Sequence, residues 1–301
     1  MINKHMKHHA FTLIELIFVI VIMGIIGKFG TEFLAKAYES FIFSKINNNL
    51  QEKTSSSIEF ISKRLEHRIK QSLMAYNPTT ATYNPLNDLG LTDDNATVLE
   101  WIGTDIDGFR GTTTPLWSGI LDLNESNTTQ LISLGTSTGA TNAQIRSLSN
   151  NTADINDSAI YFLTAALAST NPWGFTGAIV DQNKTLHPIR SGMNANELVP
   201  RGTNFLAGQE AFEFYKLTWT AYAVELGDYN DTTHIGNLYL YYNYRPWDGE
   251  TYAANGTKVL LAENINTFRY RAAGSLVKIQ ICAKSPLTGE EYALCKEKTI
   301  Y

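Results

Sequence analysis

The chain has 301 residues, with 24 lysines and arginines against 29 acidic residues, and a formal net charge of −5. Apolar residues make up 44% and charged residues 18%, so the chain can bury a folded core and is not a wholly disordered protein. This mild acidity gives no general basic surface, so no nucleic-acid partner is predicted. Two cysteines are too few for a structural zinc site made of cysteines alone.

The N-terminal segment is the most informative part of the chain. Residues 1–10 contain Lys4 and Lys7 and no acid, and residues 11–30, FTLIELIFVIVIMGIIGKFG, are almost entirely apolar. A helix over residues 11–30 is about 30 Å long, which matches the hydrocarbon core of a bilayer. We therefore expect a single membrane-spanning helix. The lysines before it place the N-terminus in the cytoplasm and the remaining chain outside.

Glu15 is an acid inside this apolar helix, where such a residue costs up to about 3 kcal/mol at mid-bilayer and usually faces a partner. Cleavage between Ala10 and Phe11 would create a new ammonium group one helical turn away from Glu15. A neighbouring copy of the chain could offer the same amine. The pattern thus predicts that Glu15 pairs with a cation that exists only after processing.

The run HHA-FTLIELIFVIVIMGIIG resembles the type IV prepilin signal of type IV pilins and type II secretion pseudopilins. In that family a prepilin peptidase removes the short basic leader and methylates the new N-terminal residue, here Phe11. The resemblance implies that Glu15 places each subunit against its neighbours in a filament, so the expected partners are other pilin or pseudopilin subunits. Ala10 stands where the family most often has glycine.

Two ordinary interpretations compete with this one. A secretory signal peptide could use residues 16–27 as its apolar region and be cut after Ala37, so that the mature chain begins at Tyr38. The second competing interpretation is a plain signal anchor. In either case the alternative function is a secreted or membrane-anchored glycan-binding β domain.

Beyond the membrane segment, apolar residues continue at helical spacing with no proline before Pro78. One helix from about residue 11 to about residue 72 is the simplest interpretation, with residues 31–76 as its amphipathic second half. The run QEKTSSS at 51–57 predicts a bend or break, because serines compete with the helix for backbone hydrogen bonds.

The remaining chain predicts an α+β, pilin-like fold: the long helix packed on a C-terminal antiparallel sheet. Residues 77–210 are rich in Thr, Asn, Ser and Gly and predict a loop-rich insertion. Residues 211–301 predict the sheet, with a hairpin turn at 272–275 in which Gly274 supplies a positive φ. Its strands are expected at 212–225, 237–245, 264–271 and 276–283.

Cys282 and Cys295 would close a short C-terminal loop, and outside the cytoplasm such a pair favours a disulfide. Eight Asn-x-Ser/Thr acceptors are present, and six of them have an acid two residues earlier. That extended pattern resembles the acceptor of bacterial periplasmic oligosaccharyltransferases, and compositional bias in Asn-rich loops is the alternative. The six candidates are Asn95, Asn124, Asn127, Asn156, Asn183 and Asn230.

Acidic loops around Asp105 and Asp228 carry oxygen ligands that suit calcium. The preferred interpretation is that these acids are solvated turn residues. We therefore expect neither a metal nor a cofactor. The chain has no G-x-S-x-G, Walker or H-E-x-x-H motif, and we do not expect an enzyme. Its length favours a minor subunit of a type IV pilus or type II secretion pseudopilus in the bacterial inner membrane, with the C-terminal domain in the periplasm.

Overall fold

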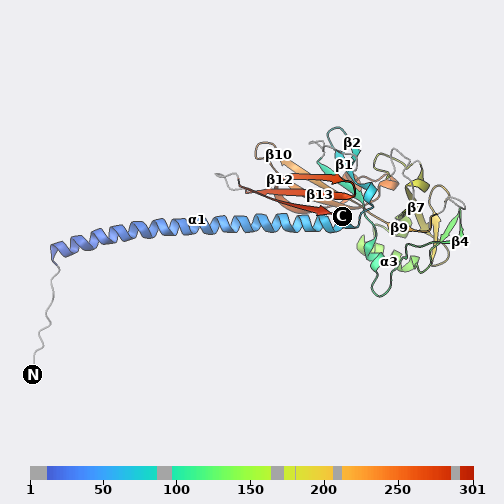
Figure 1. The fold of residues 1–301 in the computed structure, drawn as a ribbon, viewed down its shortest axis with the longest axis horizontal. Coiled ribbons are helices and arrows are strands. Elements are labelled where there is room, and N and C mark those ends of the chain that lie inside the picture. The colour runs from blue at the N-terminus through green and yellow to red at the C-terminus, as the bar shows by residue number, and fades with distance from the viewer. Residues whose placement is uncertain (1–11, 87–96, 164–172, 180, 206–211, 286–291) are drawn as a thin grey trace, which may run out of the picture. The chain divides into compact units, whose positions relative to one another are not determined.

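The computed structural model describes residues 12–86, 97–163, 173–179, 181–205, 212–285 and 292–301 (Figure 1). The chain divides into two compact units, one up to Gln51 and one from Glu52 to Tyr301. The first consists, within the described residues, of the larger part of helix α1 (Leu13–Glu66). The second holds the last turns of α1 together with two antiparallel sheets.

Helix α1 runs without interruption through residues 51–57, so the predicted break does not occur. Thr54 and Ser57, two of the small polar residues that suggested a break, are instead buried. Ser56 satisfies its hydroxyl within the helix by donating to the carbonyl of Lys53 at 3.3 Å. The buried hydroxyl of Ser57, by contrast, has no hydrogen-bond partner among the described residues.

The last turns of α1 pack on a sheet face through a stripe at helical spacing. Ile58, Ile61 and Leu65 have no exposed surface, and burying each such side chain contributes about 1.5–3 kcal/mol. Polar contacts flank the stripe. They join Lys53 to Glu263 (3.9 Å), Lys296 Nζ to Ser55 Oγ (2.7 Å) and Lys298 Nζ to Glu59 Oε2 (2.6 Å).

The helix ends at Glu66, six residues before the predicted end at residue 72. Buried Arg68 stops it, because its guanidinium donates to the carbonyl of Leu65 (2.6 Å) and to that of Ser275 (2.8 Å). Ile69 then donates its backbone N–H to Ile102 in the sheet (2.9 Å). The chain therefore leaves the helix to join the sheet, through a 3₁₀ turn at Lys70–Ser72.

The larger sheet has eight antiparallel strands in the order β14-β13-β12-β11-β10-β3-β1-β2. Its strands are β1 (Met74–Asn77), β2 (Thr82–Pro85), β3 (Val98–Ile102), β10 (Ala221–Asn230), β11 (Ile235–Tyr244), β12 (Thr257–Ala273), β13 (Leu276–Lys284) and β14 (Ala293–Ile300). This sheet and the helix on it confirm the predicted α+β layout.

The smaller sheet has six strands in the order β4-β5-β8-β7-β6-β9. Its strands are β4 (Asp122–Asn127), β5 (Gln130–Ile132), β6 (Ala159–Phe162), β7 (Leu186–Ser191), β8 (Glu197–Pro200) and β9 (Tyr215–Thr218). In the described residues, the remaining helices are α2 (Ile106–Arg110), α3 (Thr138–Leu148) and α4 (Tyr252–Asn255), with 3₁₀ turns at Ile155–Asp157, Gln182–Lys184 and Pro246–Asp248.

The predicted strands compare unevenly with the observed ones. The strands expected at 237–245 and 276–283 are β11 and β13, and Gly274 has φ 61° in the tight turn where Ala273 pairs with Leu276. The strand expected at 212–225 is wrong as a single element, because Trp219 and Thr220 interrupt it and its two parts enter different sheets. The expected strand at 264–271 lies in the C-terminal half of the longer β12.

The two sheets share a core. Val98 and Ala223 of the larger sheet and Tyr161 and Leu186 of the smaller one belong to the same cluster of buried residues, which also contains Trp173. A second cluster, including Ile145 of α3, lies within the smaller sheet and its helices. The sheets therefore form one body from Glu52 onward.

Candidate functional site

The N-terminal half of α1 presents a continuous apolar surface. Large apolar side chains from Leu13 to Ile26 are 40% to 78% exposed. Within the described residues, α1 is the one helix long and apolar enough to cross a membrane, and none of its most apolar window is buried. Exposing so much apolar surface to water is unfavourable. This segment therefore requires an apolar environment, supplied by lipid or by other helices.

Glu15 lies in the first turn of this helix and is exposed. The hydroxyl of Thr12 donates to its Oε2 at 3.5 Å, and the backbone carbonyl of Thr12 accepts from the N–H groups of Glu15 and Leu16. A carboxylate in the first turn also interacts favourably with the helix dipole. The start of α1 thus holds an acid at a fixed place on an apolar surface.

No charged residue follows Glu15 until Lys28, which at 1.5 Å per residue lies about 20 Å further along the helix axis. Helix α1 itself therefore offers Glu15 no cation within ion-pair reach. Ala10 and Phe11, the predicted cleavage and methylation residues, lie outside the described residues.

Residues 5–27 match the family model described as the prokaryotic N-terminal methylation motif. This motif is the hallmark of type IV prepilin-like proteins. No curated protein and no solved structure matches the chain significantly. The methylation motif covers the predicted cleavage residues, Glu15 and most of the exposed apolar surface of α1.

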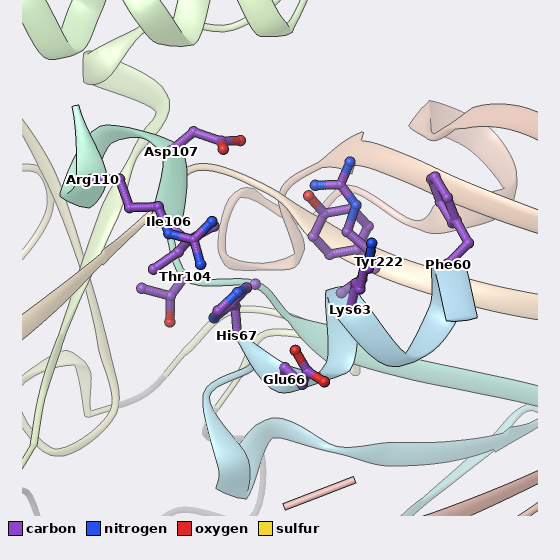
Figure 2. Close-up of a pocket in the computed structure, with 11 residues that line it drawn as sticks. Phe60, Lys63, Glu66, His67, Thr104, Ile106, Asp107, Arg110 and Tyr222 are labelled. Atoms are coloured by element: carbon purple, nitrogen blue, oxygen red, sulfur yellow. The ribbon is translucent and has the colours of Figure 1, made fainter. Parts of the chain in front are cut away.

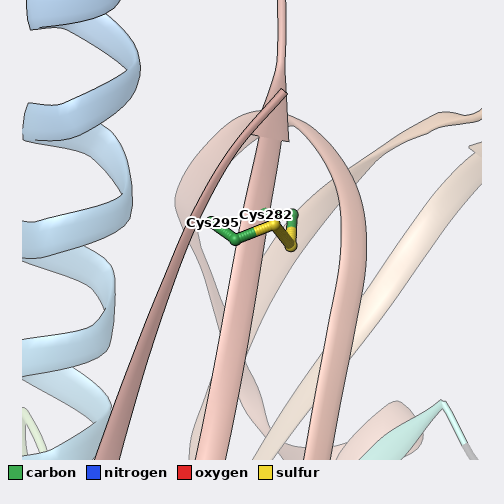
Figure 3. The surroundings of a disulfide bond; sticks show 2 residues. All are labelled: Cys282 and Cys295. Carbon is green, nitrogen blue, oxygen red and sulfur yellow. A yellow bond between two sulfur atoms is a disulfide. The ribbon is translucent and has the colours of Figure 1, made fainter. Parts of the chain in front are cut away.

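The C-terminal part of the chain carries the expected disulfide. Cys282 on β13 and Cys295 on β14 lie directly opposite each other and are bonded (Figure 3). Cys282 is buried, whereas Cys295 is exposed. The bond ties the edge strand β14 to the sheet interior.

Five of the six predicted glycosylation residues lie in the described part of the chain, and Asn95 does not. Asn124, Asn127, Asn156 and Asn230 are exposed, whereas Asn183 is half-buried. Asn183 also donates its Nδ2, the atom that would carry a glycan, to the carbonyl of Asn204 at 3.2 Å. The structure thus separates Asn183 from the exposed candidates.

Asn127 and Asn230 occupy equivalent places in two hairpin turns. The Oδ1 of Asn127 accepts from the backbone N–H groups of Thr129 and Gln130 at 2.9 and 3.1 Å. The Oδ1 of Asn230 accepts from those of Thr232 and Thr233 at 2.9 and 3.2 Å. The amide oxygen of each asparagine is therefore engaged within its own turn.

The acids considered for calcium have other partners. Asp105 is buried and accepts from the backbone N–H of Gly108 (3.2 Å) and the indole of Trp117 (3.1 Å). Burial raises the pKa of Asp105 to about 6, against the lowering effect of these hydrogen bonds. Asp228 accepts from the phenol of Tyr239. The described residues contain no group of three or more His, Cys, Asp or Glu side chains that could hold a metal ion.

A second buried acid was not singled out by the sequence. Glu100 on β3 accepts from Tyr83 (3.0 Å) and Tyr244 (2.7 Å) and is 1% exposed. Burial raises the pKa of Glu100 to about 7, although both hydrogen bonds oppose that rise. An alternating strand pattern could not reveal this acid, because its tyrosine partners come from strands far apart in the sequence.

Proposed function

We propose that this protein is a structural minor subunit of a type IV pilus or a type II secretion pseudopilus. In this proposal prepilin peptidase cuts the chain between Ala10 and Phe11 and methylates Phe11, and the mature subunit assembles with other pilin or pseudopilin subunits through α1. The role is structural rather than catalytic. The methylation motif supports the processing steps, and the length of the chain supports a minor rather than a major subunit.

The observation that carries the proposal is the exposed acid on the exposed apolar helix. Lipid satisfies the apolar side chains around Glu15 but not its carboxylate, which remains costly in an apolar medium until a cation reaches it. The N-terminal ammonium of a neighbouring processed subunit supplies that cation, while the neighbour's α1 covers the apolar surface. The ion pair of Glu15 and the burial of the apolar surface of α1 then form in the same assembly step.

We further propose that the chain crosses the bacterial inner membrane once, with its N-terminus in the cytoplasm and its C-terminal domain in the periplasm. Lys4 and Lys7 before the apolar segment support this orientation. The disulfide between Cys282 and Cys295 supports it independently, because disulfides persist in oxidising compartments.

Replacing Glu15 by alanine in the native host tests the assembly role. We expect Glu15→Ala protein to insert into the membrane at the wild-type level, because the apolar segment is retained, but to be depleted from sheared filaments or from cross-linked subunit complexes. Glu32→Ala is the matched control, since Glu32 is another exposed acid on α1. Equal incorporation of Glu15→Ala and wild type would contradict the proposal.

A further inference from the structure

Two cavities adjoin the last turns of α1, both within the unit that begins at Glu52. Their volumes are about 360 and 320 Å³. Figure 2 shows the first cavity, with side chains from the end of α1, from the turn between β3 and α2, from α2 and from β10 around it. The two cavities share six lining residues, namely Phe60, Arg64, Thr104, Ile106, Asp107 and Tyr222.

Three permanent cations line the first cavity. Lys63 and Arg64 come from α1, and Arg110 comes from α2. In Figure 2, Arg110 lies on one side of the space and Lys63 on the other. Cations from different elements therefore approach the same space from different directions.

Arg64 is held in place without a carboxylate. Its guanidinium carbon lies 5.5 Å from the centroid of the Phe60 ring and 5.6 Å from that of Tyr222. Stacking against two aromatic rings fixes a guanidinium while leaving its charge unneutralised. Among the ion pairs of the described residues, none joins Lys63, Arg64 or Arg110 to either acid of the cavity, Glu66 or Asp107.

The helix dipole accounts for only part of this arrangement. Basic side chains in a last helical turn offset the partial negative charge there, which explains Lys63 and Arg64 but not Arg110. The cavity also has a buried hydroxyl, the Oγ1 of Thr104, that has no hydrogen-bond partner. A surplus of cations around one space, beside an unpartnered buried hydroxyl, is a feature of a binding site.

We propose that this cavity binds a tetrahedral oxyanion, a phosphate or sulfate group of a small ligand. Cations that approach from α1 and from α2 can each meet a different oxygen of a tetrahedral anion, whereas a planar carboxylate is satisfied by one guanidinium fork. The adjoining cavity, lined by Leu148, Trp219 and Val259 among others, receives the organic part of an ester.

Titration calorimetry with inorganic phosphate on the full-length protein in detergent, at constant ionic strength, tests the site. We expect saturable binding that Arg64→Gln and Arg110→Gln each weaken about tenfold, which corresponds to 1.4 kcal/mol. Arg190→Gln is the control, since Arg190 is exposed on β7 in the other sheet, and it should bind as wild type does. No saturable binding, or equal binding by all three variants, would overturn the proposal.

Phenyl phosphate as a second probe distinguishes the source of the anion. Tighter binding of phenyl phosphate than of inorganic phosphate supports an ester whose ring occupies the second cavity. Equal binding supports a free anion. If neither probe binds, the site does not exist.

His67, which lines the first cavity, supplies a readout that general loss of folding would not produce. Burial and the nearby charge of Arg110 lower the pKa of His67, with Lys216 acting in the same direction and Glu66 and Asp107 opposing. An oxyanion in the cavity favours the protonated imidazole, so phosphate should raise the pKa of His67 in an NMR titration. An unchanged His67 titration in saturating phosphate would overturn the assignment.

Discussion

Cys282 and Cys295 face each other across β13 and β14, and their disulfide fixes the edge strand whose next residues reach α1. Lys296 donates to Ser55, and Lys298 pairs with Glu59 at 2.6 Å. The Lys298 hydrogen bond and charge lower the pKa of exposed Glu59, but exposed ion pairs contribute little to stability. The disulfide therefore contributes more than these contacts to keeping β14 in place.

Replacing both cysteines by serine should lower the free energy of unfolding by about 3 kcal/mol, the value for a closed loop of this size. Urea unfolding of the full-length protein in detergent measures the change. Adding a reductant to wild type should reproduce it and should not affect the double variant. A loss below about 0.5 kcal/mol would contradict the structural role.

Arg68→Met should destabilise the protein by about 3 kcal/mol, because it leaves the carbonyls of Leu65 and Ser275 without a buried charged donor. The same urea experiment measures it. Lys70→Met is the matched control, since Lys70 is exposed and two residues away, and it should change stability by less than about 0.5 kcal/mol. Similar losses in the two variants would show that Arg68 does not hold the helix end.

The buried carboxyl of Glu100 should make the free energy of unfolding depend on pH. Its pKa is about 7 in the folded protein against 4.5 for an ordinary glutamate, so between these values the folded state holds a proton that the unfolded state has released. The stability contributed by this group is therefore present at low pH and lost as the pH rises towards 7.

Glu100→Gln, which cannot ionise, should remove that loss. We expect the variant to gain on the order of 2 kcal/mol relative to wild type between pH 5 and pH 8. Urea unfolding at the two pH values measures the difference. A stability difference between variant and wild type that does not change with pH would contradict the raised pKa.

The glycosylation candidates should differ in occupancy. Glycopeptide analysis of native material is expected to find glycans at Asn127 and Asn230, which lie exposed in hairpin turns, and none at Asn183, whose Nδ2 is already bonded. Asn150 and Asn255 are internal controls, because both are exposed acceptors without an acid two residues earlier. Bare Asn127 and Asn230, or equal occupancy at the controls, would refute the extended-acceptor interpretation.

The sequence predicts the features that depend on neighbouring residues. The apolar run around Glu15, the helical stripe through Ile58 and Leu65, and the Gly274 turn are all local patterns. By contrast, β14 reads ALCKEKTI and gives no strand signal, since lysines on an edge strand discourage pairing with other chains rather than promote burial.

Long-range pairing accounts for the rest of what the sequence did not reveal. Strand β3 joins the larger sheet by pairing with β10, more than 100 residues later. That pairing brings α2 and its Arg110 to the end of α1, where Arg64 lies. No spacing in the sequence connects these two arginines, because their proximity depends on the order of strands in the folded sheet.

The mature N-terminus tests the central claim most directly. Intact-mass and N-terminal peptide analysis of protein from the native host should find a chain that begins with methylated Phe11 and lacks residues 1–10. A native protein that retains Met1, or that begins at Tyr38 after an ordinary signal cleavage, would contradict the account of Glu15 as an acid awaiting the amine of a processed neighbour.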